Sequence, residues 1–575
     1  MDNLDFFVHR HNQSIDNSNR SLHWIHHIAV KDRISTHHIS NIKPTTDIQR
    51  YNLALSLPQR STQALMCREF IVLATRMLNK HMAVFESFGD SVVHHIPHEY
   101  SSEMSTRSTD FPSGLYFKDE NKINDLVEVM RHIQQEYMPK DPDGAQHLLI
   151  GGDRLTEANC RNVQWGFSDA DTEEERMEGM HFKFEDWHAI RVLFEIHHKI
   201  FFKESAKDPG TLFANMTKLR CSNAKSGPRA AFNDYRDFVI KDTAALFLAA
   251  AIEHLGFHHV TDRPESLIPE HIKEDSPEAR RTWFNRLTAS IVDKYVLLPD
   301  ITEATEAASK PSATPIQKNK FPCRMEGCSR IFTYFKSRQT HEIKTHNLVV
   351  PTDSKPIIPT HCDHKYEHTV ARLGFSFILL DILDAVKEGD GERLMRLYTV
   401  ALLFYKAYGH TSYAYSTFLL TVQMNATLTP QVAHSLKWNR FWSTRGGQGR
   451  NIPLDLHLEH LNGFLKSFLK GLGPNLNETS AARISRTIGV VKEMMAVTDM
   501  ELGISGQTGA HHVDMTKDIL TLVDTLQEAE FFKQQPGRVY AAFPGFRKNL
   551  LAKLDHKALW NWMMLKLNEW RILPL

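Results

Sequence analysis

Residues 323–346 read CRMEGCSRIFTYFKSRQTHEIKTH and contain the ligand pattern Cys323-x4-Cys328-x12-His341-x4-His346. Two thiolates followed by two imidazoles at this spacing are typical of a short hairpin and one helix that wrap a tetrahedral Zn²⁺ ion. The four-ligand pattern is more specific than a chance array of Cys and His in a loop. The stretch therefore predicts an inserted ββα zinc finger whose metal ligands are these four residues.

Two further positions bear on the small core of this finger. Phe332 lies four residues after Cys328, where such a unit places its core aromatic ring. Arg338 occupies the position where a core leucine is usual, which weakens the apolar core. Because the metal supplies most of the folding free energy of such a unit, we still expect it to fold around zinc.

Basic residues are concentrated around the finger. Between Gln317 and His346, seven Lys and Arg side chains stand against two Glu, a balance that suits contact with phosphates. The positions that would face bases carry no Arg poised for guanine, so we expect weak sequence readout; they are Tyr334, Lys336, Ser337 and Thr340. A lone finger buries little surface, so DNA contact and a structural or protein-contacting role remain alternatives.

Composition limits the remaining possibilities. The 575 residues include 68 Lys and Arg and 68 Asp and Glu, so nucleic-acid contact requires local basic patches. Of six Cys, two belong to the finger, which is typical of a reduced intracellular protein. The start of the chain lacks an apolar signal region, and the apolar run Ala244–Ile252 is too short to span a bilayer. We expect no membrane partner and a nuclear protein, with the cytoplasm as the alternative.

Two segments without apolar periodicity divide the chain. They are rich in Pro, Ser, Thr and Ala, and they read as linkers on either side of the finger. The predicted organisation is an α/β region at 1–205, a helical region at 206–301, a linker at 302–320, the finger at 321–346, a linker at 347–360 and a helical region at 361–575.

The first region alternates between two kinds of pattern. Aromatic or β-branched runs predict strands at 6–11, 22–30, 114–117, 147–150 and 180–184. Apolar residues at helical spacing predict helices at 59–88, 121–137, 156–167 and 188–202. A hairpin followed by alternating helices and strands predicts an α/β sheet of mixed direction, and mainly helical periodicity follows, including 366–386, 392–408 and 454–469.

Carboxylates occur at the ends of several of these elements. Asp153 follows the apolar run LLIGG, Asp2 and Asp5 open the first strand, and Glu459 lies on the helix beginning near residue 454. Two carboxylates at strand ends and a third on a covering helix are what two-metal phosphoryl chemistry with Mg²⁺ or Mn²⁺ requires. Each acid alone has a plainer interpretation, and Asp153 could be the N-cap of the next helix.

Distinctive segments give the chain a resemblance to known proteins. They include LHWIHHIAVKDRI (22–34), HHIPHEYSSEM (94–104), GGDRLTEANCR (151–161), FEDWHAIRVLFEIHHKIFF (184–202), GTLFANMTKL (210–219), AVKEGDGER (385–393) and GRNIPLDLHLEHLN (449–462). From Arg20 to about Met495 the chain resembles a family of uncharacterised eukaryotic proteins, described as a domain of unknown function and thought to descend from transposable elements. This resemblance names no reaction.

The order of elements is also similar to the ribonuclease H-like core of cut-and-paste transposases. That resemblance implies a first Asp on the first strand (Asp2 or Asp5), a second at Asp153, and Glu459 on a late helix after a helical insertion. Many such transposases carry a Cys-x-x-His element one strand after the second Asp. Here Asp186-Trp187-His188 falls there, without the Cys.

Two departures from that pattern affect the functional hypothesis. Asp2 follows Met1 directly, so most of the first strand of such a core is expected to be missing, and no DNA-binding region is expected upstream of it. On this interpretation the sequence is a fragment or a trimmed relic. The hypothesis is a zinc-finger protein derived from a DNA transposase, which binds nucleic acid and whose ancestral reaction is two-metal cleavage of DNA. The alternative is a catalytically inactive zinc-binding interaction protein.

Overall fold

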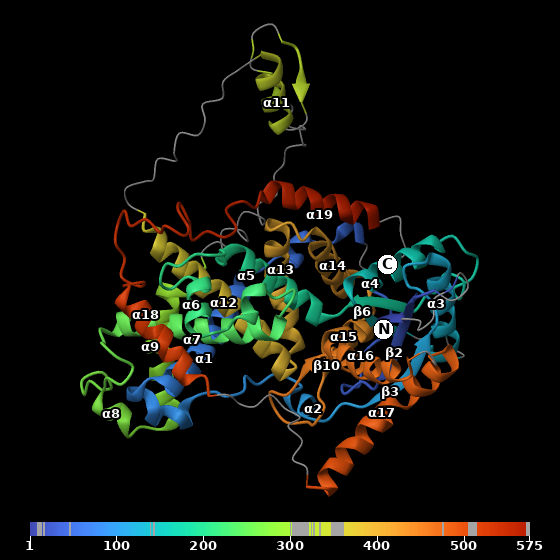
Figure 1. Ribbon diagram of the computed structural model, residues 1–575, viewed down its shortest axis with the longest axis horizontal. Helices are drawn as coiled ribbons and strands as arrows, with labels where there is room; N and C mark the ends of the chain where they lie inside the picture. Colours follow the sequence, from blue (N-terminus) through green and yellow to red (C-terminus); the bar gives the residue numbers. More distant parts are fainter. Residues whose placement is uncertain are drawn as a thin grey trace.

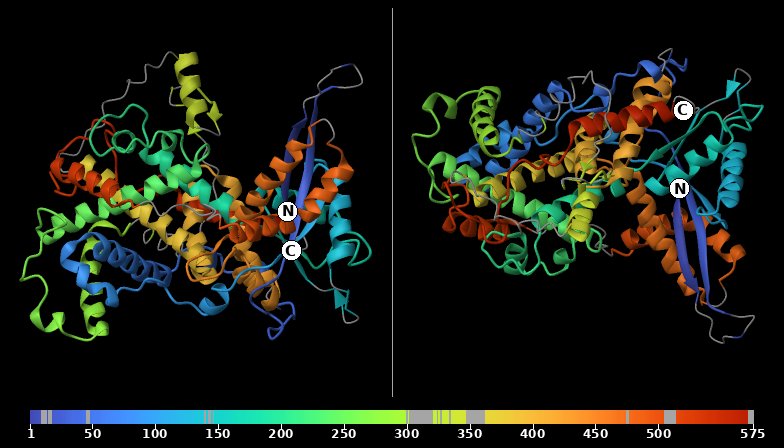
Figure 2. Two further views of the ribbon diagram at one scale, coloured as in Figure 1. Left: turned by 60° about the horizontal axis from the view of Figure 1, so that its bottom comes forward. Right: turned by 90° about the horizontal axis from the view of Figure 1, so that it is seen from above.

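The computed structural model describes residues 1–8, 14, 18–44, 48–138, 140–141, 144–145, 147–298, 301, 321–323, 325, 328–332, 335–346, 362–473, 476–503 and 514–570. This part of the chain is mostly helical and contains several small sheets. Most of the strands gather at one end of the molecule with helices α3 (Ile123–Tyr137), α4 (Arg154–Gly166), α16 (Leu454–Gly471) and α17 (Glu478–Glu501) (Figures 1 and 2). The larger helical part, with α1, α7, α9, α12 and α18, forms the other end, and the strands of the predicted finger lie beside α11 (Phe335–His346). The predicted linkers at 302–320 and 347–360 lie outside the described residues.

The largest sheet has the order β1-β2-β3 and is antiparallel throughout. Its register pairs Asp2 with His26, and a bulge at His27/Ile28 shifts the pairing with β3. The strands are β1 (Asp2–Val8), β2 (Arg20–Val30), β3 (Asp110–Tyr116), β4 (Lys140–Asp141), β5 (Gly144–Ala145), β6 (Leu148–Gly152), β7 (Met180–Phe184), β8 (Phe321–Pro322), β9 (Ile331–Phe332), β10 (Phe441–Trp442) and β11 (Ile452–Pro453).

A parallel pair, β6 and β7, lies beside the start of β1. The backbone nitrogen of Met1 donates to the carbonyl oxygen of Gly151 at 2.7 Å. Within the pair, Gly152 is in register with Phe184. Both strands therefore end at the same edge, next to the beginning of β1, and the residue that follows each strand is an acid, Asp153 or Glu185.

Helices cover both faces of the β1-β2-β3 sheet. On one face, Leu4, Phe6 and Trp24 pack against α16 and α17 through apolar residues such as Leu465 and Ile488. On the other face, Ile25 belongs to a core with α3 and α4. The alternation of buried and exposed residues along β1 follows from the two-residue period of a strand, so Asp5 and Phe7 face solvent.

The helices are α1 (Arg60–His81), α2 (Ser101–Met104), α3 (Ile123–Tyr137), α4 (Arg154–Gly166), α5 (Asp186–Phe201), α6 (Leu212–Lys218), α7 (Phe232–Leu255), α8 (Glu270–Lys273), α9 (Pro277–Tyr295), α11 (Phe335–His346), α12 (His364–Glu388), α13 (Gly391–Ala407), α14 (Thr411–Val422), α15 (Pro430–Trp438), α16 (Leu454–Gly471), α17 (Glu478–Glu501), α18 (Thr516–Glu528) and α19 (His556–Trp570). Short 3-10 turns are η1 (Ile48–Arg50), η2 (Leu53–Ser56), η3 (Ala83–Ser91) and η4 (Asn223–Ser226), and η5 (Gln423–Thr427) is π-helical. No helix in the described ranges is long and apolar enough to cross a membrane.

Within the described residues the predicted elements agree with these bounds to within a few residues, with one clear exception. Residues 9–11 of the strand predicted at 6–11 lie outside the described residues. The helix expected over 59–88 ends at His81, because Met82 adopts an extended conformation, and a 3-10 turn follows. The largest apolar core draws residues from the regions at 1–205, 206–301 and 361–575 alike. The division of the chain into those regions stays a proposal.

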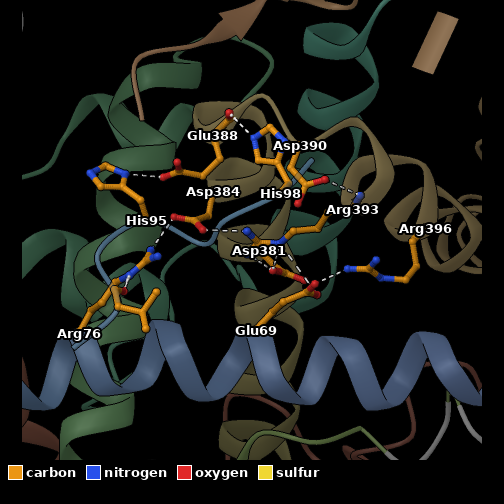
Figure 3. A network of polar contacts seen from close by, with 11 residues as sticks. Glu69, Arg76, His95, His98, Asp381, Asp384, Glu388, Asp390, Arg393 and Arg396 are labelled. Carbon is orange, nitrogen blue, oxygen red and sulfur yellow. Dashed lines mark hydrogen bonds and ion pairs between the residues drawn. The ribbon is translucent and has the colours of Figure 1, made fainter. Parts of the chain in front are cut away.

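A network of buried charges joins α1, α12 and α13 (Figure 3). Arg393 Nε donates to Asp381 Oδ1 at 2.9 Å, and its Nη1 donates to Asp384 at 2.9 Å. Arg76 of α1 binds the other oxygen of Asp384 at 2.6 Å, and Arg396 binds Glu69. Because Asp381 and Arg393 are completely buried, each needs the other to compensate its charge.

Candidate functional site

The four predicted zinc ligands come together in the structure. The ligand atoms of Cys323, Cys328, His341 and His346 all lie within 4.8 Å of one another. The hairpin of β8 and β9 supplies the thiols and α11 supplies the imidazoles, so the predicted ββα arrangement is present. Among the described residues, this is the one group of three or more His, Cys, Asp and Glu side chains placed closely enough to hold an ion.

The donor atoms fit a soft metal ion. Nε2 of His341 lies 3.1 Å from Nε2 of His346 and 3.4 Å from the Cys328 sulfur. Two imidazole nitrogens and two thiols that face one another are the donor set of a structural zinc site. Phe332 packs against the His341 ring, as the spacing predicts. The unusual Arg338 lies near buried Glu342, with 3.6 Å between Nε and Oε1, so an ion pair replaces the usual leucine contact.

The predicted base-facing positions of the finger are described only in part. Ser337 and Thr340 are exposed on α11. Tyr334 lies outside the described residues, and the side chain of Lys336 is likewise not described. Weak sequence readout therefore stays a prediction.

A second candidate site is a cavity of about 230 Å³ where the edge of β6 and β7 meets α5 and α16. We call it the acid cavity, because its lining includes the acids Asp2, Asp153, Glu185 and Asp455. His188 also lines it. These residues come from the start of β1, the ends of β6 and β7, the first turn of α5 and the first turn of α16. Segments hundreds of residues apart in the sequence thus contribute to one space.

Asp2 is held in place by α16. Asn462 Nδ2 donates to Asp2 Oδ2 at 2.7 Å, and the amide oxygen of Asn462 lies 2.7 Å from His26 Nδ1. Burial, together with the negative charges of Glu459 and Asp153, raises the pKa of Asp2 to about 7. The charges of Glu459 and Asp153 therefore act on Asp2.

Asp5 lies elsewhere. It is on the opposite face of β1 from Asp2, its side chain is 61% exposed, and its carboxylate binds His23 at 2.7 Å. Of the four predicted catalytic acids, Asp2 and Asp153 line the acid cavity, and Glu459 lies on α16 with its Oε1 3.9 Å from Nε2 of His188, another lining residue. Asp5 is not among the lining residues.

Asp153 also has the plainer role that the sequence allowed. Its Oδ1 accepts a hydrogen bond from the backbone nitrogen of Thr156 at 2.7 Å, so it is the N-cap of α4. A capping carboxylate commits one oxygen to the helix terminus. Capping fixes the orientation of Asp153 at the cavity wall and does not conflict with a second role.

Asp455 ties α16 to the first turn of α5. Its carboxylate accepts hydrogen bonds from the backbone nitrogens of Trp187 at 3.0 Å and His188 at 3.2 Å. It also lies 3.1 Å from His188 Nδ1, and His188 Nε2 lies 3.9 Å from Glu459. Burial alone would lower the pKa of His188, but the hydrogen bond and charge of Asp455 outweigh it and raise that pKa above its ordinary value. Asp455 thus favours the protonated form of the His188 ring beside the acids.

Glu185 and Asp32, two acids of the cavity lining, were not predicted from the sequence, and neither was the nearby Glu120. Glu185 follows β7 directly, as Asp153 follows β6, and the same rule of an acid after a buried strand could have found it. Glu120 binds Thr156 Oγ1 at 2.9 Å and Asn3, and burial raises its pKa to about 7. Nothing in the local sequence marks Glu120, because its position depends on the packing of distant segments.

Gly151 gives a direct test of this packing. A Cβ at residue 151 would lie 1.7 Å from Oε1 of Glu185, a buried, ion-paired side chain. We expect Gly151→Ala to lower the free energy of unfolding by about 1–3 kcal/mol, measured by urea denaturation. The control is Gly166→Ala, where nothing lies within 4 Å of the added carbon. Equal losses in the two variants would contradict the close approach.

The fold and the site together describe a mostly helical protein with a Cys2His2 group that could hold a metal such as zinc, and an acid-lined cavity at the edge of a small sheet. The sequence profile of a family of unknown function, DUF6589, matches residues 47–511, most of the chain, and the protein belongs to that family. Comparison with curated proteins and with solved structures gives no match.

Proposed function

We propose that this protein is a zinc-finger protein derived from a DNA transposase, that it binds nucleic acid, and that the acid cavity is a site for divalent-cation-dependent cleavage of DNA. The observation that carries the proposal is that Asp2 and Asp153 line one cavity and that burial, together with the charges of Glu459 and Asp153, raises the pKa of Asp2 to about 7. Carboxylates that repel one another at close quarters are stabilised by a bound cation.

A ribonuclease H-like core is part of this proposal. The order β3-β2-β1, continued through the Met1–Gly151 hydrogen bond to β6 and β7, supports it. So do the antiparallel pairing of the first three strands, the parallel pairing of the last two and the helices on both faces. In this arrangement Asp2 opens β1, Asp153 directly follows the neighbouring β6, and Glu459 lies on the covering helix α16.

Each side chain then has a definite part in the proposed chemistry. Mg²⁺ or Mn²⁺ ions held by the three acids would stabilise the attacking and leaving oxygens of a phosphodiester. Asn462 orients the Asp2 carboxylate through a hydrogen bond of 2.7 Å, and the amide oxygen of Asn462 in turn lies 2.7 Å from His26 Nδ1. Asp455 orients His188 and favours its protonated form, whose charge would offset the negative charge of the acids and of a phosphate.

The finger would add affinity for DNA or for a protein partner. Its basic residues favour phosphate contact, and its zinc ligands are the best-defined metal-binding group in the described residues. A nuclear location follows from this hypothesis, with the cytoplasm as the alternative.

Asp153→Asn tests the proposal. Asparagine caps helices as well as aspartate does, so the fold should be preserved, but the ligand charge is lost. We expect the zinc-loaded full chain to nick supercoiled plasmid DNA in the presence of Mn²⁺ and the variant to fall to background.

Asp5→Asn is the matched control, because it makes the same change on the opposite face of β1. It should nick as the unaltered protein does. Nicking that persists in Asp153→Asn would rule out this site assignment.

One observation favours a second candidate function. The carboxylates of the acid cavity do not belong to a closely grouped metal-binding set in the described residues, whereas the finger ligands do. A catalytically inactive, zinc-binding interaction protein would show this difference. It would bind a partner in a zinc-dependent way and would not nick DNA with or without Mn²⁺.

A further inference from the structure

We propose that Glu185 is an additional ligand for the divalent cation of the acid cavity, and that the Lys183 ammonium compensates its charge when no cation is bound. This inference rests on the proposed function, because it assigns a further residue to the same cation site. It is carried by the position, burial and hydrogen bonding of the two side chains.

Glu185 is placed like Asp153. The two residues follow neighbouring parallel strands whose last residues, Gly152 and Phe184, are in register. The backbone nitrogen of Glu185 donates to the carbonyl oxygen of Gly152 at 2.9 Å, which fixes Glu185 beside the backbone that precedes Asp153. Both acids therefore leave the same sheet edge and line the acid cavity.

The two acids differ in what their carboxylates do. Asp153 caps α4 with its own side chain, whereas Glu185, at the corresponding position of α5, makes no such cap. Asp455 from α16 instead accepts the hydrogen bonds of Trp187 and His188 in the first turn of α5. The Glu185 carboxylate therefore does not cap the N-terminus of α5, the role that an acid at a helix start usually has.

The Glu185 carboxylate is buried and incompletely satisfied. The Glu185 side chain is 5% exposed, and its Oε2 has no hydrogen-bond partner among the described residues. A buried carboxylate oxygen without a partner is costly, and such groups call for an explanation such as an ion. Its position against Gly151 leaves no room for a Cβ there, so the carboxylate is accommodated by that glycine at the cavity wall.

Lys183 supplies a charge that suits this interpretation. Its side chain is also 5% exposed, and its Nζ lies 3.1 Å from Glu185 Oε1 without forming a well-directed hydrogen bond in the described structure. Its charge also acts on Asp32, another acid of the cavity lining. A lysine has a flexible stem, so the ammonium can move toward Asp32 when a cation takes Glu185.

The test measures Mn²⁺ binding to the zinc-loaded full chain by electron paramagnetic resonance of free Mn²⁺. Loss of an outer partner of a metal ligand usually weakens metal binding about 10–100-fold. Because Glu185 is proposed as a direct ligand, Glu185→Gln should weaken Mn²⁺ binding at least about tenfold. Asp153→Asn should also weaken binding. Glu195→Gln on α5, whose partner is Arg191, is the control and should bind Mn²⁺ as the unaltered protein does.

A double variant guards against misfolding. Glu185→Gln alone leaves Lys183 buried without a counter-charge, whereas Lys183→Met combined with Glu185→Gln removes both charges. The double variant should melt close to the unaltered protein and still bind Mn²⁺ at least tenfold more weakly. Full affinity in this double variant, with affinity lost in Asp153→Asn, would overturn the role of Glu185 and leave the proposed function standing. Unchanged binding in Asp153→Asn as well would overturn both.

Discussion

Replacing Cys328 by serine should reduce the zinc content of the purified protein from about one equivalent to none. The four ligand atoms lie within 4.8 Å of one another, and a tetrahedral zinc site tolerates the loss of a thiolate poorly because each bond contributes strongly to affinity. Binding free energy in such a unit is also folding free energy, so the ββα unit should lose its structure when the ion is lost. Zinc is measured by plasma mass spectrometry after dialysis.

Cys67→Ser provides the matched control for this measurement. Cys67 lies on α1, far from the finger in sequence, and is a free cysteine like the two ligands. Its variant should keep the full equivalent of zinc. Retention of zinc by Cys328→Ser would show that the ion is held elsewhere, and the finger assignment would be wrong.

Arg393→Met should lower the free energy of unfolding by about 3–5 kcal/mol, the usual cost of removing one partner from a buried ion pair. The guanidinium of Arg393 binds Asp381 and Asp384, and Asp381 is completely buried (Figure 3). Methionine keeps most of the side-chain volume, so the loss reports the uncompensated carboxylates. Urea denaturation followed by circular dichroism measures it.

The same substitution at Arg263 is the comparison. Arg263 pairs with Glu86 at 2.8 Å, but both side chains are mostly exposed. Exposed pairs contribute about 0–1 kcal/mol, so Arg263→Met should have little effect. If Arg393→Met cost no more than Arg263→Met, the network of Figure 3 would not stabilise the junction of α1, α12 and α13.

Local signals in the sequence predicted much of the fold. The run LLIGG followed by Asp153 and a helical pattern corresponds to β6, an N-cap and α4, because each of these depends on neighbouring residues. The spacing of the four zinc ligands likewise predicted their grouping. Features of this kind can be predicted without knowing how distant segments of the chain pack.

The acid cavity was predictable only in part. The two-residue period of a strand places Asp2 and Asp5 on opposite faces, but the sequence does not say which face α16 covers. The Lys183–Glu185 pair is harder still, because charged residues in a strand are usually exposed and both are buried here. Their burial depends on the packing of β7 against segments from both halves of the chain.

The hydrogen bond between Asp2 and Asn462 has a consequence for biosynthesis. Its partners are 460 positions apart in the sequence. A ribosome that adds about 5–20 residues per second needs roughly 20–90 s to synthesise the chain between them. During that interval the hairpin of β1 and β2 exists without the helix that later covers it, and Leu4, Phe6 and Trp24 have no α16 to pack against. The nascent chain therefore exposes the apolar face of this hairpin for most of its synthesis.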